Sequence, residues 1–444
     1  MKRILLSAAV GLFLSQAVSS QSLNDYRTRQ SGYWHNASTW ERHNGSTWVL
    51  ASSPPEYSTA ERVTVLQAHE VYVSTEVHTD QTYVAGILNI QAGADFNIRN
   101  GGDYDLTVYI GGQVLNAGEI DVYTSATLEF RYIALYRHDQ NGGSIPKNTT
   151  WDAHSIVEIK SVTANKPTNL DQNFGDFIWN CSTQSNDISL AGNLTQIQGD
   201  FTLLSTNGKY LKFSETAGCN VTIGGDFEIG DNCKFQIAGG GADNNVEIGG
   251  DFHQTGGDFT MSDASGSIVN MTVDGDFTLE GDYFRIATAD AYSKLYLKGD
   301  FTQEGGFLTY TSTGTEGEII FCGTSEQSFV KSGGSINNKV NITVSSGAIL
   351  TLGDYVLGDW SYTTGIFTLQ SGATLITSHS GGIAASGAGG CIQTNGTRSF
   401  SQGAHYRFTR NGKQATGSGL TSTVSGSVNI GSKSTVAQPT YSTS

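Results

Sequence analysis

The sequence predicts an all-β fold, namely a right-handed parallel β-helix with three strands per coil of about 25 residues and an N-terminal cap. The motif Gly-Asp-Phe recurs at steps of 24, 26, 25, 25 and 24 residues, at positions 175–177, 199–201, 225–227, 250–252, 275–277 and 299–301. Apolar and polar residues alternate on both sides of the motif, which is typical of strands with one buried face. Among 55 glycines and 5 prolines, no proline falls in residues 168–438, which suits paired strands.

Each repeat reads as a strand, a Gly-Asp turn, a second strand and then a third strand at its own matching interval. The apolar pairs of this third strand are Leu211/Phe213, Phe235/Ile237, Phe259/Met261, Phe284/Ile286 and Phe307/Thr309. Three short strands without a helix predict one triangular coil, and successive coils then pair in parallel about 4.8 Å apart. The usual crossover preference predicts a right-handed helix.

The phenylalanines of the motif are expected to form one buried ladder, while the residues that follow them face outward. The ladder consists of Phe201, Phe227, Phe252, Phe277 and Phe301, and the outward residues are Thr202, Glu228, His253, Thr278 and Thr302. Phenylalanine buries a large apolar area, so such a ladder stabilises the interior.

Four segments are expected along the chain. Residues 1–20 have a positive start, an apolar run and a small-residue exit, as in a secretory signal peptide. Residues 21–75 hold three of the six tryptophans and are predicted to form the first coil and a cap that covers its otherwise open edge. Residues 76–430 form the β-helix, and residues 431–444 are a polar low-complexity tail. The sequence therefore predicts an exported protein without a membrane span.

Charge and cysteine content restrict the partners. The formal net charge is −16, so a nucleic-acid partner is not expected, and we expect an extracellular glycan or protein surface instead. Cys181, Cys219, Cys233, Cys322 and Cys391 show no CxxC pair and lie beside strand-like residues, which favours buried free thiols. A Cys219–Cys233 disulfide is the alternative in an exported protein.

Two parts of the chain resemble known families. The order Gly32-Tyr-Trp34, Thr39-Trp40, Pro54-Pro55, Val63/Val65, His69 and Val71/Val73 resembles the domain family named for its eight glycines, found at the start of β-helices in secreted proteins. The segments at 174–181, 191–201, 320–327 and 373–383 resemble repetitive surface proteins of Bacteroidetes. This resemblance implies an adhesin-like or structural exoprotein on the outer surface of a Gram-negative cell. Such proteins usually end in a β-sandwich sorting domain, and residues 431–444 do not read as one.

The repeated aspartates are the sharpest candidate site in the sequence. They are Asp200, Asp226, Asp251, Asp276 and Asp300, and at one corner of the coil their carboxylates would stack about 4.8 Å apart. Like charges at that spacing repel, and calcium between coils would relieve the repulsion. The favoured interpretation is that each Asp caps its own turn by accepting backbone N–H groups. Calcium is thus the alternative, and no cofactor is expected.

A non-catalytic surface or matrix protein is the favoured function, with a polysaccharide lyase or glycosidase on the same scaffold as the alternative. A glycosidase needs two carboxylates about 5 Å or 6.5–9.5 Å apart. Candidates are Asp282, Arg285, Asp290 and Lys294 in one repeat and Glu304, Glu316 and Glu318 in the next two. The segment Arg131–Trp151 breaks the period and is a candidate ligand-contact loop. Each of these also fits an ordinary exposed position, so no catalytic, metal or cofactor residue is assigned.

Overall fold

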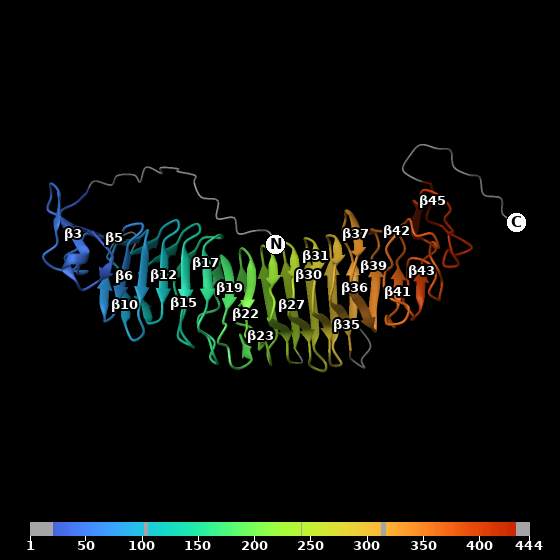
Figure 1. Ribbon diagram of the computed structural model, residues 1–444, viewed down its shortest axis with the longest axis horizontal. Coiled ribbons are helices and arrows are strands. Elements are labelled where there is room, and N and C mark those ends of the chain that lie inside the picture. The colour runs from blue at the N-terminus through green and yellow to red at the C-terminus, as the bar shows by residue number, and fades with distance from the viewer. Residues whose placement is uncertain (1–20, 102–104, 241, 312–316, 432–444) are drawn as a thin grey trace.

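The computed structural model describes residues 21–101, 105–240, 242–311 and 317–431. They form a β-solenoid of about 14 turns with roughly 24 residues per turn, so the predicted parallel β-helix is confirmed. The coils stack along one axis into a rod (Figure 1). One short 3₁₀ turn, Ala37–Thr39, is the single helical element of the described residues. The predicted signal peptide, residues 1–20, and tail residues 432–444 lie outside the described residues.

The first wall consists of the strands that precede the repeated Gly-Asp corner. It is divided into two sheets, and within each the solenoid strands pair in parallel. The N-terminal sheet contains β1 (Asp25–Thr28), β5 (Arg62–Val65), β8 (Thr82–Val84), β11 (Leu106–Val108), β14 (Leu128–Phe130) and β16 (Thr149–Trp151). The C-terminal sheet contains β18 (Asn173–Phe174), β21 (Gln196–Ile197), β24 (Cys219–Ile223), β27 (Asp243–Ile248), β30 (Ile268–Val273), β33 (Tyr292–Leu297), β36 (Gly317–Phe321), β39 (Val340–Val344), β41 (Phe367–Leu369) and β43 (Arg398–Phe400).

The second wall follows the Gly-Asp corner and runs through nearly all described coils. Its strands are β2 (Gly32–Tyr33), β6 (Glu70–Val73), β9 (Ile87–Ile90), β12 (Gln113–Asn116), β15 (Leu135–His138), β17 (Ile156–Ile159), β19 (Asp176–Asn180), β22 (Phe201–Ser205), β25 (Phe227–Ile229), β28 (Phe252–Gln254), β31 (Phe277–Leu279), β34 (Phe301–Gln303), β37 (Glu326–Lys331), β40 (Ile349–Gly353), β42 (Thr374–Thr377), β44 (His405–Phe408) and β45 (Val428–Ile430). This wall keeps the coils in line where the other two walls are interrupted.

The third wall closes the triangle and is the least continuous of the three. Its N-terminal sheet contains β7 (Val77–Thr79), β10 (Asp95–Ile98) and β13 (Glu119–Val122). Its second sheet contains β20 (Ile188–Ser189), β23 (Tyr210–Ser214), β26 (Lys234–Ala238), β29 (Asp258–Ser262), β32 (Tyr283–Ala287), β35 (Phe307–Tyr310) and β38 (Ser335–Asn338). The coils between these sheets carry loops instead of a third-wall strand, and these coils include the predicted ligand-contact loop.

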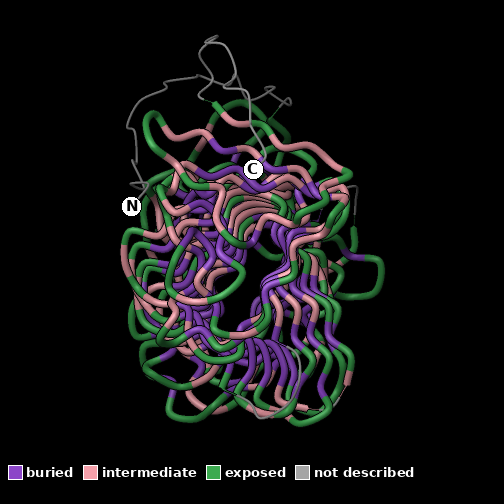
Figure 2. Tube along the Cα trace, turned by 90° about the vertical axis from the view of Figure 1, so that its right-hand side faces the viewer, coloured by how far each residue is buried: buried purple, intermediate pink, exposed green. Residues whose placement is uncertain are grey.

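The interior is one apolar core along the rod. Seen along the rod, the coils superpose, with buried residues lining the inside of the walls (Figure 2). The predicted ladder is confirmed, because its five phenylalanines pair in register from coil to coil and each is fully buried. Phe277 and Phe301 stack with ring centroids 5.3 Å apart. Glu228 is exposed, whereas the other four predicted outward residues are half-buried.

One third-strand residue differs from the expectation. Phe307 is 43% exposed, and Leu308 takes its interior position, whereas Thr309 is buried as expected and Tyr310 is buried beside it. The reason is the corner before the strand. Gly306 has φ +66°, and the first residue after such a left-handed corner residue points outward here. The other four third-strand pairs are buried as predicted.

The N-terminal end of the rod is built differently from the coils. Strand β3 (Trp40–His43) pairs antiparallel with β1 and with β4 (Trp48–Leu50). Trp34 and Trp40 are buried, and their rings meet edge to face with centroids 5.0 Å apart. Trp34 also contacts Phe96 of the core, at 5.7 Å. Two large rings thus cover the apolar interior at this end.

Candidate functional site

The repeated aspartates link neighbouring coils. The carboxylate oxygen Oδ1 of each Asp accepts the backbone N–H of the Asp one coil later, at 2.8–2.9 Å. This ladder runs through Asp176, Asp200, Asp226, Asp251, Asp276 and Asp300. It ends where Oδ1 of Asp300 accepts the N–H of Ser328, at 2.7 Å. The prediction that each Asp caps its own turn is therefore wrong, because the accepted N–H group belongs to the next coil.

The glycine before each Asp is required by this contact. A Cβ atom on Gly275 would lie 2.3 Å from Oδ1 of Asp251 and 2.6 Å from the Gly250 carbonyl oxygen. Gly199, Gly225, Gly250 and Gly299 would meet the preceding carboxylate in the same way. None of the five has a positive φ. The Gly-Asp pair is thus explained by close approach between coils.

The next question is whether the described residues could hold a metal ion. No group of three or more His, Cys, Asp or Glu side chains there is arranged to hold a metal ion. In the aspartate ladder, one oxygen of each carboxylate already accepts a backbone N–H. The ladder therefore has a structural explanation that requires no calcium.

The charged residues considered for a glycosidase are divided between two walls. Arg285 lies on the third wall, where it pairs with Asp258 at 3.2 Å. Asp282 lies at the corner before β32, and its Oδ2 accepts the N–H of Gly257 at 2.7 Å. Lys294 lies on the first wall, where it pairs with Glu318 at 3.7 Å.

The remaining acidic candidates lie at corners of the coil or outside the described residues. Asp290 lies in the corner between β32 and β33, where its carbonyl oxygen accepts the N–H of Gly266. Glu304 is exposed at the corner before β35. Glu316 lies outside the described residues. The Arg285–Asp258 pair and the Lys294–Glu318 pair thus lie on different walls of the coil.

The cysteines and histidines have local structural contacts. All five cysteines are free, so Cys219 and Cys233 form no disulfide, and Cys322 alone is partly exposed. Burial raises the pKa of Cys219 to about 12, which keeps it a thiol. His253 faces outward and pairs with Glu280 at 2.8 Å, and His69 contacts Thr28 at 2.8 Å.

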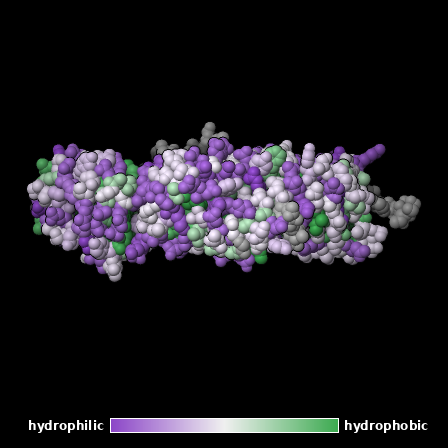
Figure 3. Space-filling view, turned by 90° about the horizontal axis from the view of Figure 1, so that it is seen from below, coloured by the Kyte–Doolittle hydropathy of each residue, from purple (hydrophilic) through white to green (hydrophobic). Residues whose placement is uncertain are grey.

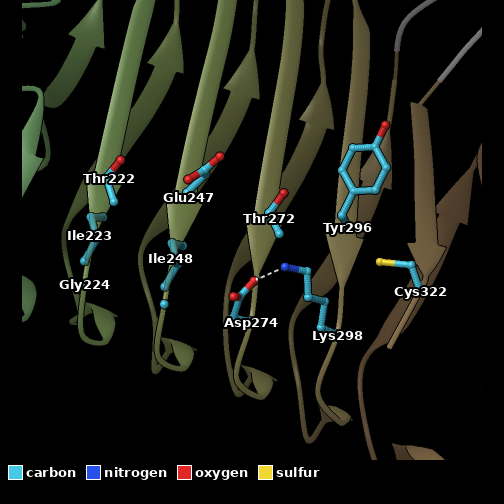
Figure 4. A pocket seen from close by; sticks show the side chains of 11 residues that line it. Thr222, Ile223, Gly224, Glu247, Ile248, Thr272, Asp274, Tyr296, Lys298 and Cys322 are labelled. Atoms are coloured by element: carbon cyan, nitrogen blue, oxygen red, sulfur yellow. Dashed lines mark ion pairs between the residues drawn. The ribbon is translucent and has the colours of Figure 1, made fainter. Parts of the chain in front are cut away.

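The first wall carries a shallow hollow of about 410 Å³ on its outer face. Thr222, Glu247, Thr272 and Tyr296 project from successive strands along it (Figure 4). Asp274 and Lys298 form an ion pair at 2.7 Å at its edge, and this hydrogen bond raises the pKa of Lys298. Cys322 lines the same hollow, and burial raises its pKa. The hollow combines hydroxyl, carboxylate, aromatic and ammonium groups in a row.

Beside this hollow, asparagine side chains form a second ladder. Asn245 donates to Oδ1 of Asn220 at 2.9 Å, and Asn270 donates to Oδ1 of Asn245 at 3.2 Å. This ladder was not predicted, although its residues recur at steps of 25 residues. Comparison of polar as well as apolar residues at the repeat interval would have found it.

The predicted ligand-contact loop, Arg131–Trp151, borders a joint between the two sheets of the first wall. Among the described residues, no strand pairing connects β16 to β18. A hollow of about 420 Å³ lies there, lined by Asn148, Thr149, Thr150, Trp151, Asp171, Gln172, Asn173 and Gln198. Side-chain amides bridge the joint, since Trp151 donates to Gln172 at 3.2 Å and Gln198 donates to the Trp151 carbonyl at 3.4 Å.

Comparison with known proteins assigns no family to this chain. No protein-family model, no curated protein and no solved structure matches the chain. In the described residues, no helix has the length and apolarity needed to cross a membrane. The function must therefore be argued from the residues themselves.

Proposed function

We propose that this chain is a non-catalytic, exported surface or matrix protein whose walls contact extracellular glycans by many weak interactions. The observation that carries the proposal is the repetition of outward polar groups. The amides of Asn220, Asn245 and Asn270 are aligned on the first wall, next to the row that begins with Thr222. Equivalent groups one coil apart suit multivalent contact, in which weak interactions sum through effective concentration.

The resemblance to secreted repetitive surface proteins supports export and an adhesin-like role. Export into an aqueous environment is also supported by the surface composition. The face of the rod seen from below is mostly hydrophilic, with isolated hydrophobic patches (Figure 3). The charge of −16 disfavours polyanionic partners and favours neutral or cationic ones. Catalysis needs unlike groups that converge in a partly water-excluded site. The charged candidates instead pair locally on two different walls.

The test is a glycan array and a polysaccharide-hydrolysis screen with residues 21–444. We expect binding to neutral glycans in the micromolar-to-millimolar range and no release of sugar fragments. Double replacement of Asn220 and Asn270 by Ala should weaken binding, while replacement of Asp290 by Ala should leave it unchanged. Absence of any glycan binding would overturn the proposal. Release of fragments that is abolished by Ala at Asp282 or Asp290 would instead favour the polysaccharide lyase or glycosidase.

A further inference from the structure

We infer that the third wall carries a stacking site for a sugar ring, formed by Tyr283 and Phe307 and open on the side of Ser335. This inference rests on the proposed function, because it names the residues and the ligand class through which one wall would contact glycans. It comes from the outward row at the start of the third-wall strands. That row runs in register through Tyr210, Lys234, Asp258, Tyr283, Phe307 and Ser335.

The two aromatic rings form an exposed stack. Their centroids are 5.1 Å apart with an interplanar angle of 22°. Tyr283 is 40% exposed and Phe307 43% exposed, although both lie in strands whose next residues are buried in the core. The repeat offers Phe307 an interior position one residue away, and the Gly306 corner turns it outward instead. The two rings lie side by side and form one exposed apolar patch, and such a patch points to a use on the surface.

The stack of the two rings has two different ends. Charged groups contact the Tyr283 end, and the Phe307 end has room for a further ring. The guanidinium of Arg285 lies 4.3 Å from the Tyr283 ring centroid and pairs with Asp258. On the other side, the residue in register with Phe307 is Ser335, whose side chain is far smaller than a ring. The next coil therefore leaves room over Phe307 at the height where a further ring would stack.

A pyranose fits this position by its chemistry. One face of a pyranose presents C–H groups, which pack on an aromatic ring, and its rim presents hydroxyl groups. The hydroxyl of Ser335 lies on the adjoining strand and can bond to that rim, and Glu304 is exposed at the corner before β35. With acidic residues nearby and a net charge of −16, a neutral sugar is favoured over a uronic acid.

The size of the stack argues against a protein partner. A fully buried aromatic side chain covers about 150–250 Å², so two rings exposed by roughly two fifths offer on the order of 170 Å². A stable protein–protein interface needs about 800 Å² per partner. A narrow stack of rings is sufficient for one or two sugar units and too small for a protein interface.

The experiment uses residues 21–444 and isothermal titration with neutral hexasaccharides of glucose, xylose, mannose and galactose, plus a galacturonate hexasaccharide. We expect one or more neutral sugars to bind and the galacturonate not to bind. Phe307→Ala should weaken binding at least tenfold, Phe307→Tyr should retain it, and Ser335→Phe should block it by filling the open position. The matched control is Tyr57→Ala, which removes a ring of 50% exposure outside the three walls and should change nothing.

The outcomes separate the two proposals. If the original chain binds neutral glycans and Phe307→Ala binds them equally well, the stacking site is wrong and the proposed function stands. If the original chain binds no glycan, both proposals are overturned. If Phe307→Ala and Tyr57→Ala weaken binding equally, the rings act only as general apolar surface and the inference is wrong. Circular dichroism of each variant shows whether the fold is retained.

Discussion

The corners between the first and second walls are closed in two different ways along the rod. Near the N-terminal end several corners close on themselves, as where Gly112 N–H donates to the Tyr109 carbonyl and Ala134 N–H to the Arg131 carbonyl. In the middle, each corner is held by the aspartate of the preceding coil. Beyond the ladder the corners close on themselves again, as where Ala348 N–H donates to the Ser345 carbonyl. The middle coils therefore have a carboxylate link between successive corners, in addition to the backbone hydrogen bonds that also join the outer coils.

The largest effect is expected from the core of the coupled region. Phe277→Ala removes a fully buried ring that contacts Phe252, Phe284 and Phe301, and should cost about 3–5 kcal/mol. Hydrogen exchange should show lost protection in the coils around residue 277 and retained protection in the cap, because a solenoid shares few contacts between distant coils. A uniform loss along the rod would contradict this localisation.

A glycine of the aspartate ladder tests the contact between successive corners. Gly275→Ala places a methyl group against the Asp251 carboxylate and the Gly250 backbone, and should cost about 1–3 kcal/mol as overpacking does. Gly389→Ala is the matched control, since no atom lies within 4 Å of its Cβ position. Denaturant unfolding measures both. Equal stability of the two variants would mean that the coils can separate at this corner without cost.

The carboxylate itself is expected to contribute less. Asp276→Ala removes the acceptor for the Asp300 N–H and should cost about 1 kcal/mol, a typical net value for one hydrogen bond. Asp276→Asn keeps an oxygen acceptor at the same place and should retain most of that stability. The comparison of the two variants by thermal unfolding isolates the hydrogen bond from the loss of charge. If Asn is as harmful as Ala, charge rather than hydrogen bonding is the important property.

The repeat spacing made the walls and the phenylalanine ladder predictable, because residues 24–26 apart in sequence must lie one above another in a coil. Spacing does not tell which neighbour a side chain bonds, so the aspartates were assigned to their own turns instead of the next coil. It also does not fix the face of a strand after a corner, which depends on the φ of one residue such as Gly306. The sugar-stacking position was missed for this second reason. The joint between β16 and β18 was missed because the irregular coils carry no repeat.

A pH dependence is expected in the N-terminal coils, where the Asp80 carboxyl group lies beside a second carboxyl group, that of Asp105. Burial and a hydrogen bond to Asp105 raise the pKa of Asp80 from 3.8 to about 6. The folded chain then holds a proton between about pH 4 and pH 6 that the unfolded chain has released, so this pair loses stability as the pH rises through that window. Asp80→Asn removes the titration. The variant should melt at a higher temperature than the original chain at pH 7–8, and the difference should vanish near pH 4. His138, whose pKa is lowered by burial, titrates in both chains and cancels in the comparison. A difference in melting temperature that is constant across this range would show that the pKa of Asp80 is not raised in the folded chain.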